Sequence, residues 1–179
     1  MKYISLLRGI NVSGQKKIIM KDLKALYASL GFENVVTYIQ SGNVVFESDA
    51  NADTLIEKIK NAMSKAYCFD VPVQVRSVSA FESIINACPF THLDLEEEGT
   101  RVMVTFLASV PSEASVEKLM TYVKEPERLE LTGREIYLHC PNGYGKTKLS
   151  NIFIENKLKV GATTRNWKSV VKLHALGTD

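Results

Sequence analysis

The stretch VVTYIQSGNVVFES, residues 35–48, decides the fold that this sequence predicts. Its two runs, VVTYIQ (35–40) and VVFES (44–48), are rich in β-branched and aromatic residues, as strands are. Gly42-Asn43 between them fits a two-residue hairpin turn. Because helical patterns flank this stretch on both sides, we expect the hairpin to lie in the middle of a mixed unit.

The residues before the hairpin predict a strand and then a helix. Lys2–Leu7 is short, apolar and partly aromatic, as a strand would be. One helical face at the spacing i, i+3, i+4, i+7 is formed by Leu23, Leu26, Tyr27 and Leu30. Gly31 then takes the position of a left-handed residue that ends a helix, and Phe32 can pack back on Tyr27.

The residues after the hairpin predict a second helix and a closing strand. Thr54 and Glu57 have the spacing of a capping box. The apolar stripe of the helix that follows consists of Leu55, Ile59, Met63 and Ala66. VPVQVRSV (71–78) then has the composition of a strand. The order strand-helix-strand-strand-helix-strand is that of the ferredoxin-like motif.

The second half of the chain repeats this order. RVMVTFL (101–107) predicts a strand, Ser112 begins a helix, and LELTGREIYLHC (129–140) predicts a hairpin. We expect the closing strand to be lost, since only Leu158–Val160 remains as a short candidate. The half would end instead in an extra C-terminal helix.

The predicted fold class is therefore α+β, with duplicated ferredoxin-like (βαββαβ) halves. The first half covers residues 1–78, a connecting segment covers 79–99, and the second half with its C-terminal helix covers 100–179. Corresponding elements start at similar intervals, although the halves share no residue-level identity.

Composition places the chain among ordinary soluble globular proteins. It has 179 residues, 45% of them hydrophobic and 23% charged. No apolar run approaches the ~18 residues of a membrane span, and no signal-peptide pattern precedes the first strand. The three cysteines stand at wide spacings and form no metal-binding pair, which fits a reducing compartment. We therefore expect a cytoplasmic protein without a membrane partner; its oligomeric state stays open.

The positive charge is concentrated at the two ends of the chain. The formal net charge is +2. Residues 1–67 hold 9 Lys+Arg and 6 Asp+Glu, residues 68–140 hold 6 and 12, and residues 141–179 hold 7 and 2. If the basic ends meet in space they would attract an anion; the alternative is scattered solvated surface.

Three segments form a distinctive set: YISLLRGINVSGQKKIIMKDLKALYASLGF, VVTYIQSGNVVFES and ATTRNWKSVVKL. In them the chain resembles an uncharacterised bacterial family, the domain of unknown function numbered 1697. Ser13-Gly14 stands where that family usually has Gly-Gly. The resemblance implies a duplicated ferredoxin-like architecture and brings no activity, cofactor or catalytic residue.

The loop RGINVSGQKK is the first candidate site. Its glycines let backbone N–H groups turn toward a ligand, and the N-terminus of the next helix favours an anion. Arg8 could grip a phosphate or carboxylate with two hydrogen bonds, and Asn11, Lys16 and Lys17 could add further contacts. The alternative is a crossover loop with solvated lysines, although a dozen residues is long for such a connection.

Two further blocks offer polar side chains. Ser41 and Asn43 in QSGN could contact a ligand, or could serve only the hairpin turn. In TTRNWKS we expect Thr163 or Thr164 to cap the last helix, which would place Arg165 and Asn166 in its first turn. Ligand binding and a structural role for these residues are both open.

The block PNGYGKTK (141–148) resembles a phosphate-binding P-loop but lacks its spacing. The P-loop pattern requires glycine where Cys140 stands. A weaker hypothesis survives, in which Lys146 and Lys148 hold an anion at the start of a helix.

The residues that could carry catalysis are few. The three histidines are far apart in sequence, and His139 and Cys140 are expected to point to opposite faces of one strand. We identify no metal-ligand pattern and no catalytic residue, so the cofactor is unknown and enzymatic activity stays open.

The leading hypothesis is binding of an anionic, phosphate-bearing or nucleotide-like ligand by loops from both chain ends. The alternative is a protein–protein interaction module in which these loops are structural. RNA binding ranks third, because the sheet lacks two of the three aromatic residues of an RNA-recognition motif.

Overall fold

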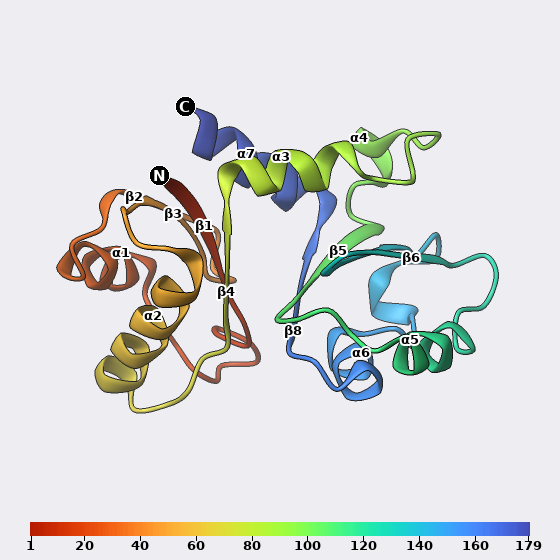
Figure 1. The fold of residues 1–179 in the computed structure, drawn as a ribbon, viewed down its shortest axis with the longest axis horizontal. Helices are drawn as coiled ribbons and strands as arrows, with labels where there is room; N and C mark the ends of the chain where they lie inside the picture. Colours follow the sequence, from red (N-terminus) through yellow and green to blue (C-terminus); the bar gives the residue numbers. More distant parts are fainter. The chain divides into compact units, whose positions relative to one another are not determined.

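A computed structural model describes residues 1–179 (Figure 1). The fold class is the predicted one, α+β, with two four-stranded antiparallel sheets. Contacts divide the chain into two units, Met1–Glu82 with Leu173–Asp179, and Ser83–Lys172. The boundaries drawn from the sequence at residues 78 and 100 stay a prediction. No helix has the length and apolar composition needed to cross a bilayer.

The first unit has the ferredoxin-like order. Its main elements are β1 (Lys2–Leu7), α1 (Met20–Ser29), β2 (Glu33–Tyr38), β3 (Asn43–Glu47), α2 (Ala52–Tyr67) and β4 (Val73–Ser77), followed by α3 (Val78–Asn86). The sheet order is β2-β3-β1-β4. Figure 1 shows α1 and α2 together on one side of this sheet.

The core of the first unit lies between the sheet and these two helices. Alternate strand residues point into it, as the two-residue period of a strand requires. They meet Leu23 and Tyr27 of α1 and Leu55, Ile59 and Met63 of α2, all of which are fully buried. The predicted stripe of α2 is therefore confirmed at these three positions.

The second unit has the same order of elements. After α4 (Leu95–Glu98) come β5 (Val102–Leu107), α5 (Glu113–Met120), β6 (Arg128–Thr132), β7 (Glu135–His139), a 3-10 turn η1 (Tyr144–Lys146), α6 (Asn151–Leu158) and β8 (Ala162–Asn166). The helix α7 (Trp167–Thr178) ends the chain. The sheet order, β6-β7-β5-β8, corresponds strand by strand to that of the first unit.

The correspondence extends to single hydrogen bonds at the end of each first strand. Leu7 N–H donates to Gly42 O at 2.8 Å, and Leu107 N–H donates to Arg134 O at 2.8 Å. In both units the last residue of the first strand is therefore tied to the residue just before the third strand. The two halves share local geometry as well as strand order.

The prediction that the second half loses its closing strand was wrong. Residues 162–166 form β8, which pairs antiparallel with β5, whereas Leu158–Val160 lies at the end of α6 and in the turn after it. The run Ala-Thr-Thr-Arg-Asn has no apolar alternation, because every residue after Ala162 is polar or charged, and only Ala162 and Thr163 are buried. It is held in the sheet by backbone pairing and by a hydrogen bond of 2.7 Å between the hydroxyls of Thr105 and Thr164.

The position of the first hairpin turn was also wrong. Asn43 is the first residue of β3 and pairs with Tyr38, so the connection is the four-residue stretch 39–42. Ile39 and Gly42 both have positive φ, +50° and +82°. The turn at Gly133, in contrast, lies where the sequence places it, between β6 and β7.

The sequence predicted the end of α1 correctly and the start of α2 incorrectly. Gly31 has φ +82°, and Phe32 N–H donates to Tyr27 O, so the predicted left-handed end of α1 is confirmed. The start of α2 was predicted wrongly. Asn51, not Thr54, is its N-cap residue, and its side chain accepts a hydrogen bond from Thr54 N–H.

Candidate functional site

Asn11 organises the loop between β1 and α1. Its Oδ1 accepts from Ile18 N–H at 2.8 Å, and its Nδ2 donates to Ile18 O and to Gln40 O, both at 2.9 Å. The side-chain amide thus uses all of its hydrogens within the protein. Asn11 closes the long loop on itself and ties it to the β2–β3 connection, and a direct ligand contact through it stays a prediction.

Arg8 and Lys16 lie in the same loop, between β1 and α1. Arg8 is half-buried, and its backbone N–H donates to Pro72 O at 3.0 Å. Lys16 Nζ donates to Asp70 O at 2.7 Å and lies 5.5 Å from the centroid of the Phe69 ring. These contacts draw the ammonium group of Lys16 toward the start of β4.

Ser41 and Asn43 lie beside this loop, in the β2–β3 connection. Asn43 is buried, and its Nδ2 donates to Tyr38 O at 3.0 Å and to Ser41 Oγ at 2.9 Å. Gly42 between them packs against the loop so closely that a Cβ atom there would lie 2.6 Å from Ile10 Cδ1. The LLRGIN and QSGN blocks therefore meet in space, as neighbouring parts of the first unit.

A hollow of about 430 Å³ opens where these two blocks meet the N-terminus of α1. We call it the loop–helix pocket; its lining residues are Asn11, Gly14, Lys17, Ile18, Ile19, Met20 and Gln40. Of the predicted ligand residues, Lys17 and Asn11 lie in it. Lys17 is exposed, whereas the amide of Asn11 is already engaged.

The GYGKTK and TTRNW blocks also meet, within the second unit. Tyr144 Oη accepts from Asn151 N–H at 2.9 Å, and Thr164 Oγ1 donates to Asn151 Oδ1 at 2.8 Å. Asn151 Nδ2 donates in turn to Ala162 O at 3.0 Å. Burial raises the pKa of the Tyr144 phenol. This network fixes the start of α6 to β8 and engages both the oxygen and the nitrogen of the Asn151 side-chain amide.

Arg165 and Asn166 lie at the end of β8, not in the first turn of a helix as predicted. Asn166 is the residue that caps α7, since its Oδ1 accepts from Ser169 N–H at 2.9 Å. Arg165 is half-buried, and burial lowers the pKa of its guanidinium to about 10, so it stays charged at neutral pH. The cap was misplaced because both threonines belong to β8.

Lys146 and Lys148 differ in their surroundings. Lys146 is exposed at the end of η1. Lys148 Nζ lies 4.9 Å from the ring centroid of Tyr122 and 5.6 Å from that of Phe153. Lys157 Nζ approaches the same two rings, at 4.8 and 5.4 Å. We call Lys148, Lys157, Tyr122 and Phe153 the lysine–aromatic cluster.

The sequence analysis did not find the other three members of this cluster. They come from the segment after α5 and from α6, and nothing in their sequence spacing places them beside Lys148. An aromatic residue and a lysine four positions apart in α6, Phe153 and Lys157, were the one available signal, because such a pair shares a helical face.

His139, Cys88 and Cys140, whose side chains are suited to acid–base or thiol chemistry, are buried. His139 Nε2 lies 3.2 Å from Glu98 Oε2, and Arg101 Nη1 lies 2.9 Å from Glu98 Oε1. Burial raises the pKa of the Cys140 thiol to about 11 and also raises that of Cys88. Neither thiol is therefore activated as a nucleophile.

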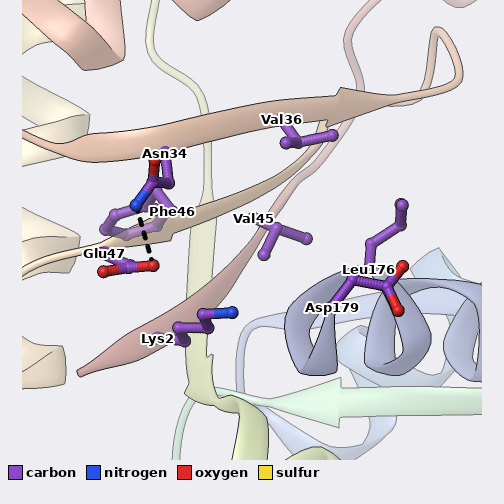
Figure 2. A pocket seen from close by; sticks show the side chains of 8 residues that line it. All are labelled: Lys2, Asn34, Val36, Val45, Phe46, Glu47, Leu176 and Asp179. Carbon is purple, nitrogen blue, oxygen red and sulfur yellow. Dashed lines mark hydrogen bonds between the residues drawn. The ribbon is translucent and has the colours of Figure 1, made fainter.

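A second hollow of about 430 Å³ in the first unit holds none of the predicted residues (Figure 2). Its charged and polar groups include Lys2, Asn34 and Glu47, and Asn34 Nδ2 donates to Glu47 Oε1 at 3.0 Å. Val36 and Val45 contribute apolar surface. Because positive and negative side chains share this hollow, it favours an anion less than the loop–helix pocket does.

Comparisons with known proteins agree with this fold. A family model described as "Protein of unknown function (DUF1697)" matches residues 1–137. A solved structure, the conserved bacterial protein SP0830 from Streptococcus pneumoniae, is similar with a TM-score of 0.78 and 24% identity, covering 98% of this chain and 97% of that one. Among curated proteins, no relative matches the sequence. The likeness to the solved structure concerns the fold alone.

Proposed function

This chain belongs to the DUF1697 family of proteins of unknown function, and from that premise we propose that it binds a phosphate-bearing ligand in the loop–helix pocket. The proposal narrows the prediction made from the sequence to one pocket of the first unit. It requires that the pocket offers hydrogen-bond donors and positive charge, and that its walls suit the remainder of such a ligand.

The observation that carries the proposal is the open N-terminus of α1. Its N-cap residue is Ile19, which has no side-chain acceptor, and no side chain caps the helix. The first intrahelical bond runs from Leu23 N–H to Ile19 O. The N–H groups of Met20, Lys21 and Asp22 therefore have no acceptor in the protein. Unpaired N–H groups at a helix start are donors suited to an anion.

Charge around this helix end favours an anion only in part. The helix dipole stabilises a negative group there by typically 0.3–1 kcal/mol, which on its own gives weak binding. Lys17 adds an exposed ammonium group in the pocket wall. Asp22 in the first turn competes, because its carboxylate already offsets part of the dipole. A ligand phosphate must therefore gain from both Lys17 and the N–H groups.

The remainder of the pocket is mostly apolar, which constrains the ligand. Ile18, Ile19 and Met20 contribute its apolar wall, and Ile19 is 66% exposed. Gln40, in the β2–β3 connection, also lines the pocket. A phosphate ester with an apolar or aromatic portion fits these walls better than inorganic phosphate does.

The test is calorimetric titration of the full chain with inorganic phosphate and with a nucleoside monophosphate. We expect Lys17→Gln to weaken binding and Asp22→Asn to strengthen it, because the latter removes the competing carboxylate. Lys24→Gln is the matched control: Lys24 is exposed on α1 and does not line the pocket. Equal affinity in all four proteins, or no binding by any, would overturn the proposal.

A second candidate function, a protein–protein interaction module, is favoured by apolar side chains around the same blocks. Val12 and Ile19 of the loop are 58% and 66% exposed, and Ile39 of the β2–β3 connection is 49% exposed. Exposed apolar side chains that gather on one face mark an interaction surface. Val12→Ser/Ile39→Ser should abolish capture of a protein partner and leave the titration with a phosphate ester unchanged.

A further inference from the structure

The lysine–aromatic cluster is built on the helical layer of the second unit. Figure 1 shows α5 and α6 side by side on the same side of the second sheet. Tyr122 follows α5 and Phe153 lies in α6, and their rings meet edge to face with centroids 5.1 Å apart. Both rings are half-buried, so part of each faces solvent. The pair is a fixed aromatic platform, because it also packs on the core of this unit.

Two ammonium groups lie close to this platform without a carboxylate partner. Lys148 and Lys157 are each within 5 Å of the Tyr122 ring centroid, at 4.9 and 4.8 Å. Neither forms a salt bridge. Each ammonium group is attracted by the negative face of the aromatic ring. Two like charges gathered at one ring repel each other, and an anion that bridges them would relieve that repulsion.

Two more lysines flank α6 in the sequence. Lys146 precedes the helix, Lys159 follows it, and both are exposed. Helix α6 has eight residues. Its axis is therefore on the order of 12 Å long, from a rise of about 1.5 Å per residue. A single phosphate cannot contact lysines at both ends of this helix, whereas a chain of phosphates can.

We propose that the lysine–aromatic cluster of the second unit binds the backbone of single-stranded nucleic acid. Non-specific binders of single strands combine a positively charged track with aromatic rings on which bases stack. In the protein alone the two ammonium groups lie close to the rings. When they turn to phosphates, the face of Phe153 or Tyr122 becomes available to a base. An acidic peptide would also meet the lysines but would gain nothing from the rings.

This site shares no residue with the loop–helix pocket and goes beyond the function proposed above. Either proposal can therefore fail alone. Binding at the cluster depends on Lys148 and Lys157, and binding in the pocket depends on Lys17.

The test measures fluorescence anisotropy of labelled oligo-dT and oligo-U, each about 12 nucleotides long, with the full chain at several salt concentrations. We expect the double variant Lys148→Gln/Lys157→Gln to bind on the order of tenfold more weakly than the unchanged protein at about 50 mM salt. The slope of log K against log salt should also fall by roughly 0.7 per lysine.

The control is Lys21→Gln/Lys24→Gln, which removes the same charge from exposed positions of α1. It should leave the slope unchanged. An equal effect of the two double variants, or no binding of either oligonucleotide at low salt, would overturn the proposal.

Two further arms separate nucleic acid from other polyanions. Phe153→Leu keeps the lysines and removes a ring, so it should weaken binding of both oligonucleotides, with folding checked by a thermal melt. Binding as strong as that of the unchanged protein would exclude base stacking and overturn the assignment. Polyglutamate is the competitor: if it binds as tightly as oligo-U and is equally sensitive to Lys148→Gln/Lys157→Gln, the partner is an acidic protein instead.

Discussion

Asn11 Nδ2 donates a hydrogen bond of 2.9 Å to Gln40 O, which joins two connections of the first unit through residues that are 29 positions apart in the chain. The same amide closes the loop through Ile18 at both its N–H and its carbonyl. Asn11 also has φ +54°, a conformation that asparagine adopts more readily than most residues. The shape of the loop–helix pocket thus depends on one side chain.

We predict that Asn11→Ala lowers the free energy of unfolding by about 2–4 kcal/mol, since three hydrogen bonds are lost and two carbonyls and one N–H lose their partner. Urea denaturation measures the change. Asn11→Gly is the control for backbone conformation, because glycine accepts positive φ without strain. If Asn11→Gly were as stable as the unchanged protein, the hydrogen bonds would contribute little.

Gly42 provides a prediction about close packing. A Cβ atom there would lie 2.6 Å from Ile10 Cδ1 and 2.7 Å from Leu7 Cβ, and its φ is +82°. Gly9 has φ +73° but nothing within 4 Å of its Cβ position. Gly42→Ala should therefore cost about 1–3 kcal/mol more than Gly9→Ala, since only the former is overpacked. Equal losses in chemical denaturation would show that backbone conformation alone matters.

The pH dependence of stability tests the contact of Glu98. The hydrogen bond with His139, and then the contacts with Arg101, hold the pKa of the Glu98 carboxyl below its ordinary value. A carboxyl with a lowered folded-state pKa adds stability above its unfolded pKa, about 4.3. That contribution is lost as pH falls through the folded pKa. Between neutral and acidic pH, the free energy of unfolding should therefore fall less for Glu98→Gln than for the unchanged protein. Denaturation at a series of pH values measures this, and an equal fall in the two proteins would contradict the prediction.

Features that depend on neighbouring residues could be predicted from the sequence, whereas features that depend on contacts between distant residues could not. The end of α1 at Gly31 and Phe32 was readable because a left-handed cap depends on residues a few positions apart. The strand β8 was missed because Thr163 and Thr164 carry no apolar alternation and are held by pairing with β5. Sequence periodicity cannot reveal a strand whose stability comes from its neighbour.

For the candidate sites, too, local features were predicted and contacts between distant residues were not. The sequence indicated that the long loop before α1 and the lysines after β7 matter, since glycine, lysine and loop length are local features. It could not indicate that the amide of Asn11 is fully used, because its partner Gln40 lies on another connection. Nor could it place Lys148 against Tyr122, which comes from a segment 26 residues away.

The pKa of the Tyr122 phenol reports the positive charge of the lysine–aromatic cluster. The hydrogen bond and positive charge of Lys157 hold the pKa of the Tyr122 phenol below its ordinary value, and Lys118 and Lys148 act in the same direction. Lys157→Gln removes the largest of these effects. We therefore predict that the first tyrosine to ionise does so at higher pH in Lys157→Gln than in the unchanged protein.

Ultraviolet absorbance during an alkaline titration measures this change. Burial raises the pKa of Tyr27 and of Tyr137, so these phenols ionise later and do not obscure Tyr122. Lys159→Gln is the matched control, because it removes the same charge from an exposed residue that contacts neither ring. Tyr122→Phe identifies the signal by removing it. If the early ionisation persisted in Lys157→Gln, Lys157 would not be bound to the phenol, and the two ammonium groups would not share this ring in solution.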